Sequence, residues 1–277
     1  MSQNELEVFF PRDEEELFET LSPETKIING GTDLMVRKHL NRLDAKRLVS
    51  LDKMEGLRKI SDEGDSFRVF ARTTYSDILN HTACEEFPVL AKAIREIGST
   101  QIRNRGTLTG NVVNASPAGD AVLALYLLEA MIVIHSKNEQ KTIRIDNFIK
   151  GPGKTVLEAD QYVHSIIIPK AGKGSTHYFK KVGQRKAMAI SIASMGAVYT
   201  LKKGMFLNLA IAFGSLGPTV IRAEKVEAKA LGMPFNEQTL STLAQISSNT
   251  VKPITDVRAS AQYRKEVAGN LIISILS

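Results

Sequence analysis

The longest apolar run in the chain, residues 121–134, limits most narrowly what the chain can fold into. It has 14 residues and contains Glu129, so it is too short for a helix that crosses a bilayer. Its sequence predicts a mostly buried helix over residues 117–129 and then a strand over residues 131–135. Residues 1–7 are acidic and lack the basic and then apolar pattern of a secretory signal. We therefore expect a soluble, cytoplasmic protein with no membrane span.

Length and composition exclude several classes of protein. The 277 residues leave room for two domains, and 43% apolar with 24% charged residues exclude a disordered chain. Cys84 is the only cysteine, which excludes an internal disulfide, a cysteine-ligated iron–sulfur cluster and a zinc ribbon. The 36 Lys and Arg residues outnumber the 30 Asp and Glu residues, but they are spread along the chain without interleaved aromatic residues. We therefore expect no nucleic-acid partner.

Strand and helix patterns are mixed along the whole chain, which favours an α/β or α+β fold with a larger first domain. Residues 98–119 are polar and show no periodicity, as is typical of a long loop. Residues 171–175 follow a strand and are small and flexible, so we expect the domain boundary there. The predicted strands are 6–10, 26–28, 47–51, 67–70, 131–135, 141–145, 163–168, one near 178 and 206–213; the predicted helices are 11–21, 87–97, 117–129, 237–248 and about 256–276.

The usual catalytic signatures are missing. Gly153-Lys154-Thr155 is similar to the end of a Walker A loop, but Phe148 stands where that loop needs a glycine. No Gly-x-Gly-x-x-Gly opens a helix after a strand, and residues 214–217 lack the spacing of a nucleophile elbow. The five histidines show no metal-ligand spacing, so no metal site is predicted. His135 and His164 lie in apolar strands, where we favour a structural histidine over a ligand.

The first segment with a chemical signal is residues 27–34, Ile-Ile-Asn-Gly-Gly-Thr-Asp-Leu. An apolar strand ends here in Gly30 and Gly31, and the capping residues Thr32 and Asp33 follow. Glycine allows a sharp turn and lets a ligand approach the N–H groups without a Cβ in the way. Successive amides in such a turn form an anion-binding nest. The alternative is a tight strand-to-helix turn with an ordinary cap.

The second such segment, residues 101–120, has three glycines, three asparagines and several hydroxyls ahead of an apolar helix. Neutral hydrogen-bonding groups suit a large polar ligand that is held without acid–base chemistry. Arg103 and Arg105 could pair with a phosphate or with a partner's carboxylates. The alternative is a plain surface loop, but ordered loops over about 15 residues are uncommon without a function. The neutral groups belong to Thr107, Thr109, Asn111, Asn114 and Ser116.

The chain resembles the FAD-binding medium subunit of molybdenum hydroxylases in six segments. These are residues 28–34, 101–111, 114–120, 178–185, 212–215 and 256–264. That family includes xanthine dehydrogenases, aerobic carbon monoxide dehydrogenases, and nicotinate and 4-hydroxybenzoyl-CoA oxidoreductases. The resemblance covers nearly the whole chain in the family's order. It implies an α+β fold: a two-lobed, PCMH-type FAD-binding domain over residues 1–170, with lobes of about 1–53 and 54–170, and a smaller α+β C-terminal domain over residues 171–277.

The resemblance also implies which residues bind FAD. The first segment would wrap the FAD pyrophosphate with its backbone amides, in agreement with the nest argument. The second would bind the other side of the cofactor, and Asp120 would complete the site. Of two lysines expected near the flavin ring, Lys181 is preferred over Lys180. The implied set is Ile27, Ile28, Asn29, Gly30, Gly31, Thr32, Asp33, Leu34, Thr107, Leu108, Thr109, Gly110, Asn111, Asp120, Lys180 and Lys181.

Two positions depart from the family's pattern. Thr109-Gly110 stands where Gly-Gly is usual, so one backbone approach to the cofactor is expected to be widened or replaced by a hydroxyl contact. Asn29 stands where a small residue is usual. Both are expected to change the affinity for FAD without removing a group on which binding depends.

The mechanism that the resemblance implies needs partners. A molybdenum cofactor on a large subunit would hydroxylate the substrate, with a purine as the expected class. Two [2Fe–2S] clusters on a small subunit would pass electrons to this FAD, and from there to NAD+ or another acceptor. The single cysteine agrees with clusters held by a partner. The chain would then bind, orient and tune its cofactor, without a catalytic side chain, in a dimer of heterotrimers.

Two other functions stay open at this point. One is a scaffold subunit of the same complex that has lost its flavin, which only Thr109 encourages. The other is a stand-alone flavin oxidase.

Overall fold

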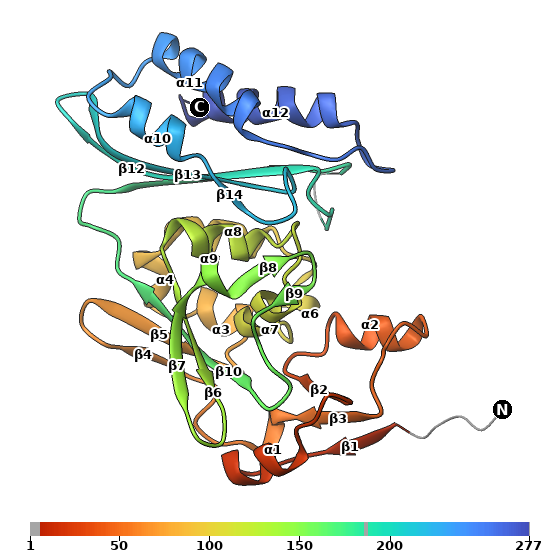
Figure 1. Ribbon diagram of the computed structural model, residues 1–277. Helices are drawn as coiled ribbons and strands as arrows, with labels where there is room; N and C mark the ends of the chain where they lie inside the picture. The colour runs from red at the N-terminus through yellow and green to blue at the C-terminus, as the bar shows by residue number, and fades with distance from the viewer. Residues whose placement is uncertain (1–5, 186–187, 277) are drawn as a thin grey trace.

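The computed structural model describes residues 6–185 and 188–276, which form three parts stacked from the N-terminal to the C-terminal end, each with its own sheet (Figure 1). The first part is a parallel sheet of order β1-β3-β2 with two helices. Asp13 caps the first helix by accepting from the Glu16 amide, and three acidic residues follow in its first turn, where the helix dipole favours them. The elements are β1 (Glu7–Phe9), α1 (Glu14–Thr20), β2 (Thr25–Ile28), α2 (Leu34–His39), β3 (Arg47–Ser50) and η1 (Leu51–Lys53).

The second part is an antiparallel sheet of order β4-β5-β10-β6-β7 with helices packed on it. Every residue of α8 is buried, which explains why its sequence is apolar on all sides after Asp120 in its first turn. The elements are β4 (Ile60–Asp62), β5 (Ser66–Phe70), α3 (Tyr75–Leu79), α4 (Ala83–Glu86), α5 (Pro88–Arg95), α6 (Thr100–Arg103), α7 (Leu108–Asn114), α8 (Asp120–Leu127), β6 (Met131–His135), β7 (Gln140–Arg144), α9 (Ile145–Phe148), the hairpin β8 (Ile149–Gly151) and β9 (Lys154–Thr155), and β10 (Tyr162–Pro169).

The third part is an antiparallel sheet of order β11-β12-β13-β14. Its helices cover the face turned away from the rest of the molecule (Figure 1), while the other face packs on α8. A Cβ at Gly196 would lie 2.6 Å from Leu127 and 2.8 Å from Leu123, so the sheet and α8 meet closely there. The elements are β11 (Thr176–Val182), β12 (Ala193–Lys202), β13 (Met205–Gly214), β14 (Ile221–Arg222), α10 (Glu224–Ala230), α11 (Glu237–Thr250), α12 (Ala261–Ile273) and η2 (Ser274–Leu276).

Several predicted elements need correction. Residues 98–119 contain α6 and α7 rather than one long loop, because each helix is too short to show a period. Strand β12 was not predicted: its small residues, such as Gly196, read poorly as a strand but are needed between α8 and the C-terminal helices. The helix α10 was also missed. The last helix begins at Ala261, where Ser260 caps it, and not at residue 256.

No helix among the described residues is long and apolar enough to cross a membrane.

Candidate functional site

The loop between β2 and α2 presents free backbone amides. Within residues 6–185 and 188–276, the N–H groups of residues 30–34 find no acceptor, although the next one, of Met35, donates to Gly31 O. Gly31 has φ +72°, which turns the chain sharply at the end of the strand. Asp33 stands at the N-cap of α2 but does not cap it, and its carboxylate instead pairs with Arg37 at 3.1 Å. A turn with five unpaired amides matches the nest rather than an ordinary capped turn.

The second segment crosses directly behind this loop. A Cβ on Gly30 would lie 2.0 Å from the carbonyl oxygen of Arg105 and 2.9 Å from Gly106 Cα. Only a residue without a side chain allows the two backbones to approach so closely. Gly30 therefore sets the spacing between the first lobe and the second segment.

The two departures from the family's pattern contact one another. Asn29 Nδ2 donates to Thr109 Oγ1 at 2.9 Å, and the Thr109 hydroxyl donates to Ala71 O at 2.6 Å. Thr109 is fully buried, so its hydroxyl is used inside the protein. The pair joins the first loop to α7 and to the residue that follows β5.

Other residues of the second segment differ in whether their side chains have partners inside the protein. Thr107 caps α7 by accepting from the Gly110 amide at 3.1 Å, and Leu108 lies in the core at 0% exposure. Asn111 Oδ1 is buried and has no hydrogen-bond partner among the described residues. A buried oxygen without a donor is costly for a protein, so this amide is a candidate ligand for a polar group. Arg103 does not face a ligand, since it donates to the carbonyl oxygens of Ile97 and Gly98.

A cavity of about 460 Å³ opens between the first loop and the second segment. The ends of three neighbouring parallel strands line it, because the carboxyl ends of parallel strands meet at one edge of a sheet. Ser50 and Asp52, which sequence reasoning missed, could have been found from this rule. The lining residues are Val8, Phe10, Ile28, Gly30, Gly31, Thr32, Met35, Ser50, Asp52, Gln101, Ile102 and Arg105.

Asp120 and Lys181 form a buried ion pair between the second part and the third. Lys181 Nζ lies 2.9 Å from Asp120 Oδ2 and also donates to Glu96 O at 2.7 Å. The two side chains are 7% and 6% exposed. Burial raises the pKa of Asp120, while Lys181 and the Ser191 hydroxyl, which donates at 2.8 Å, oppose that rise. Lys180, the neighbour on β11, is exposed.

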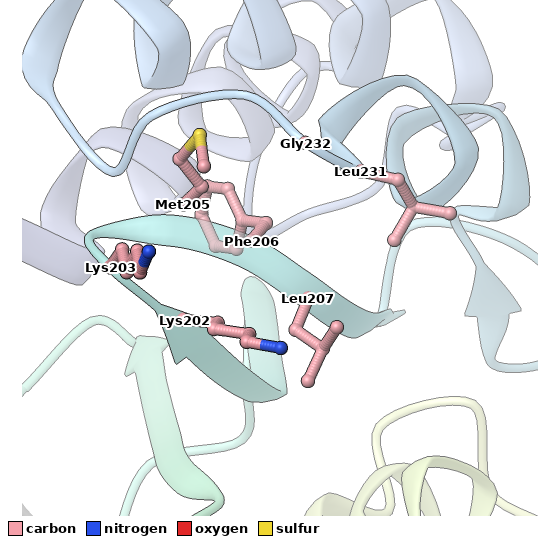
Figure 2. A pocket seen from close by; sticks show the side chains of 7 residues that line it. All are labelled: Lys202, Lys203, Met205, Phe206, Leu207, Leu231 and Gly232. Atoms are coloured by element: carbon pink, nitrogen blue, oxygen red, sulfur yellow. The ribbon is translucent and has the colours of Figure 1, made fainter.

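A second hollow of about 350 Å³ lies in the third part, at the turn between β12 and β13 (Figure 2). Lys202, Lys203 and Leu207 line it together with Leu231. None of the residues implied for FAD binding lies there.

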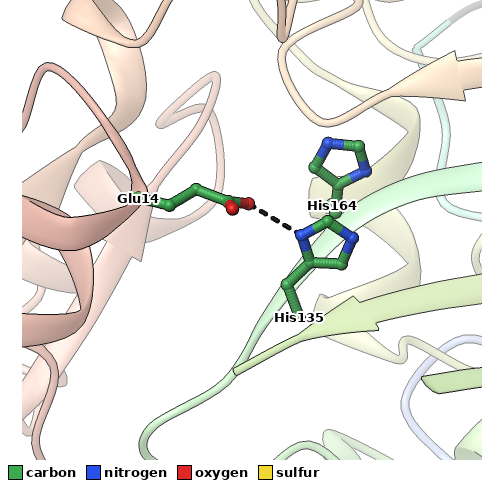
Figure 3. Close-up of side chains that lie close together, drawn as sticks. All are labelled: Glu14, His135 and His164. Carbon is green, nitrogen blue, oxygen red and sulfur yellow. Dashed lines mark hydrogen bonds and ion pairs between the residues drawn. The ribbon is translucent and has the colours of Figure 1, made fainter. Parts of the chain in front are cut away.

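One group of candidate ligands was not indicated by sequence spacing. Glu14, His135 and His164, from α1, β6 and β10, offer ligand atoms that lie within 4.8 Å of one another (Figure 3). The sheet and the packing of α1 bring them together, although 121 positions separate Glu14 from His135.

A substitution at Thr109 tests whether its hydroxyl is needed inside the protein. Thr109→Val keeps the shape but leaves Ala71 O and Asn29 Nδ2 unpaired in the interior. We expect it to lower the free energy of unfolding by about 1–3 kcal/mol, measured by urea denaturation. Thr242→Val, at a helix position whose hydroxyl bond is exposed, is the matched control and should change stability by less than about 0.5 kcal/mol. Equal stability of the two variants would contradict this assignment.

Two family models match this chain. Residues 4–171 match the family model described as the FAD binding domain in molybdopterin dehydrogenase. Residues 177–277 match the model of the CO dehydrogenase flavoprotein C-terminal domain.

Three individual proteins are similar over almost their full length. The xanthine dehydrogenase FAD-binding subunit of Escherichia coli O157:H7 is 31% identical, over 92% of this chain and 89% of its own. The nicotinate dehydrogenase FAD-subunit of Eubacterium barkeri is 30% identical, over 87% of this chain and 83% of its own. Among solved structures, this chain is similar to carbon monoxide dehydrogenase of Hydrogenophaga pseudoflava, in a form that lacks the Mo-pyranopterin moiety. The TM-score is 0.91 at 26% identity, over 97% of this chain and 95% of the solved one.

Proposed function

Because this chain belongs to the family of FAD-binding subunits of molybdenum hydroxylases, we propose that it carries electrons through a bound FAD. The electrons would come from [2Fe–2S] clusters of a partner subunit and pass to NAD+ or another acceptor. The observation that carries the proposal is the row of five amides, at residues 30–34, that find no acceptor in the described part of the chain and lie beside a cavity of about 460 Å³. Free amides beside a cavity suit a phosphate-bearing ligand better than a substrate that needs acid–base chemistry.

The first loop is assigned to the FAD pyrophosphate. Asn29, Gly30, Gly31, Thr32 and Asp33 would surround it, with backbone N–H groups donating to the phosphate oxygens. Ile27, Ile28 and Leu34 flank this turn. The absence of a Cβ at Gly30 keeps the loop close to the second segment, so that one ligand can contact both.

The second segment is assigned to the opposite side of the cofactor. Within residues 107–111, Gly110 and Asn111 are the two that are not buried, and the unpartnered Asn111 Oδ1 would accept a hydrogen bond from the ligand. Thr107, Leu108 and Thr109 support that contact from inside, through the cap of α7 and the core. They would position the backbone without presenting side chains to FAD.

Lys181 and Asp120 are assigned to the flavin end of the site. Their ion pair joins β11 to α8, and the Ser191 hydroxyl completes it. A fixed pair of this kind holds the C-terminal domain in one position against the FAD-binding domain. FAD supplies the redox chemistry when bound, and these residues bind, orient and exclude water.

The partners follow from the same family. We propose a small [2Fe–2S] subunit, a large molybdenum-cofactor subunit and a cytoplasmic dimer of heterotrimers. A xanthine dehydrogenase-like activity on a purine is the proposed reaction of the complex. Relatives at 31% and 30% identity carry the names of xanthine and nicotinate dehydrogenases, so sequence identity alone does not distinguish between these substrates.

The visible absorption spectrum of the purified full-length chain tests the proposal. We expect a flavin spectrum and one FAD per chain released on denaturation. The competing function is a scaffold that has lost its flavin, and it would show no flavin even in a complex with both partners that hydroxylates substrate. Thr109, which encouraged that alternative, has a hydroxyl bonded within the protein and leaves the amides of residues 30–34 free.

A further inference from the structure

Three side chains from separate elements meet at the junction of the first two parts, away from the flavin site. Glu14 lies in the first turn of α1, His135 at the end of β6, and His164 in β10. His135 Nδ1 is 2.7 Å from Glu14 Oε1, and the two imidazole rings are stacked with centroids 4.0 Å apart (Figure 3). Two imidazoles and a carboxylate are the ligand types that Zn²⁺ binds in proteins.

An irregularity in the sheet creates this arrangement. Tyr162 pairs with His135 and Val163 with Ile134, but Ser165 pairs with Val133, so His164 is the extra residue of a β-bulge. In a regular ladder His164 would pair with Val133, which lies two residues before His135 on β6. Bulges redirect side chains and are frequent beside functional sites.

The cluster has an outer partner and an opening to solvent, and two cationic side chains, Arg68 and Lys59, also lie near His164. The Tyr162 hydroxyl donates to Glu14, as outer partners do to a ligating carboxylate. His164 Nδ1 lies 3.1 Å from the Ser165 hydroxyl, an outer contact of the kind that orients a ligating imidazole ring. The Glu14 carboxylate is 44% exposed, which opens a route for an ion from solvent.

We propose that Glu14, His135 and His164 form a binding site for one divalent cation of the Zn²⁺ class. Ligand atoms around a tetrahedral Zn²⁺ stand about 3.3 Å apart, as follows from bonds of about 2.0–2.1 Å. The three groups lie within 4.8 Å of one another, so side-chain rotations close the set around one ion, with water as the fourth ligand. A bound ion would link α1 of the first lobe to the sheet of the second lobe. This structural role is additional to the proposed electron transfer.

Zinc binding by the full-length chain, prepared without a histidine tag and stripped with a chelator, tests the site. After dialysis against ZnCl₂ the wild type should retain one Zn²⁺ per chain by mass spectrometry. Saturating Zn²⁺ should raise its Tm by about 5 °C. His164→Gln should weaken Zn²⁺ binding at least about tenfold, and Tyr162→Phe, which keeps all three ligands, should weaken it about tenfold.

The control is His39→Gln, since His39 is exposed and lies outside the cluster. It should bind Zn²⁺ as the wild type does. The proposal fails if the wild type retains no Zn²⁺, if His164→Gln and Glu14→Gln both bind it as tightly as the wild type, or if His39→Gln loses it. The flavin content of each sample is a separate readout, so failure here is distinct from failure of the FAD assignment.

Discussion

Gly30→Ala should release FAD from the purified chain, with a loss of affinity of more than about a hundredfold, or roughly 3 kcal/mol. The new Cβ would lie 2.0 Å from Arg105 O and 2.7 Å from Arg105 C, and both of these are backbone atoms. A flexible side chain could move aside, but here the loop and the second segment must separate. That separation widens the cavity and moves the amides of residues 30–34 away from the second segment.

The first measurement of this effect is the flavin content of the purified chain. The second is a titration of FAD into chain that was denatured to remove its flavin and then renatured. Gly172→Ala is the matched control: it adds the same methyl group where a Cβ meets no atom of the described residues within 4 Å. The control should keep wild-type FAD content, and far-UV circular dichroism should show both variants folded. Full flavin content in Gly30→Ala would refute the assignment of this loop to the pyrophosphate.

Lys181→Met should destabilise the flavin-free protein by about 3–5 kcal/mol, because it leaves the Asp120 carboxylate buried without its counter-charge. Among the described residues, Asp120 would keep only the Ser191 hydroxyl as a side-chain partner, in a position where its side chain is 6% exposed. Lys180→Met makes the same chemical change one residue earlier on β11, at an exposed position. The control should alter the free energy of unfolding by less than about 0.5 kcal/mol.

A double-mutant cycle separates the ion pair from simple packing. Adding Asp120→Asn to Lys181→Met removes the buried charge, so the double variant should be more stable than the sum of the two single losses predicts. We expect a coupling energy of about 1–3 kcal/mol from urea denaturation. Additive losses, or equal effects of Lys180→Met and Lys181→Met, would contradict a structural ion pair at this position.

Much of the functional prediction was available from local sequence. The family, the FAD cofactor and the α+β class that the resemblance implied are confirmed by the family models over residues 4–171 and 177–277. The residues themselves predicted the glycine turn with its free amides, because glycines at the end of an apolar strand act locally. The roles of single residues at the site stay proposals, with Gly30 and Lys181 the most directly testable.

Other features depend on contacts between distant residues. Thr109 and Asn29 each depart from the family's pattern, but their side chains hydrogen-bond to one another although 80 positions separate them in the sequence. Which of Lys180 and Lys181 is buried could not be read locally, since neighbouring strand residues point to opposite faces and the contacts of Lys181 with Asp120 and Glu96 O arise only in the fold. The His135–His164 pair required the bulge in β10.

By itself, the sequence determined the elements with strong periodicity, the buried helix α8 and the glycine turn, because these follow from short-range sterics and from the burial of apolar side chains. Which polar groups find partners depends on the tertiary structure: the amides of residues 30–34 meet no acceptor among residues 6–185 and 188–276, the Thr109 hydroxyl bonds inside the protein, and Asp120 pairs with Lys181. Hydrogen bonds and ion pairs act over a few ångströms. Their partners therefore become known only when the fold brings distant segments together.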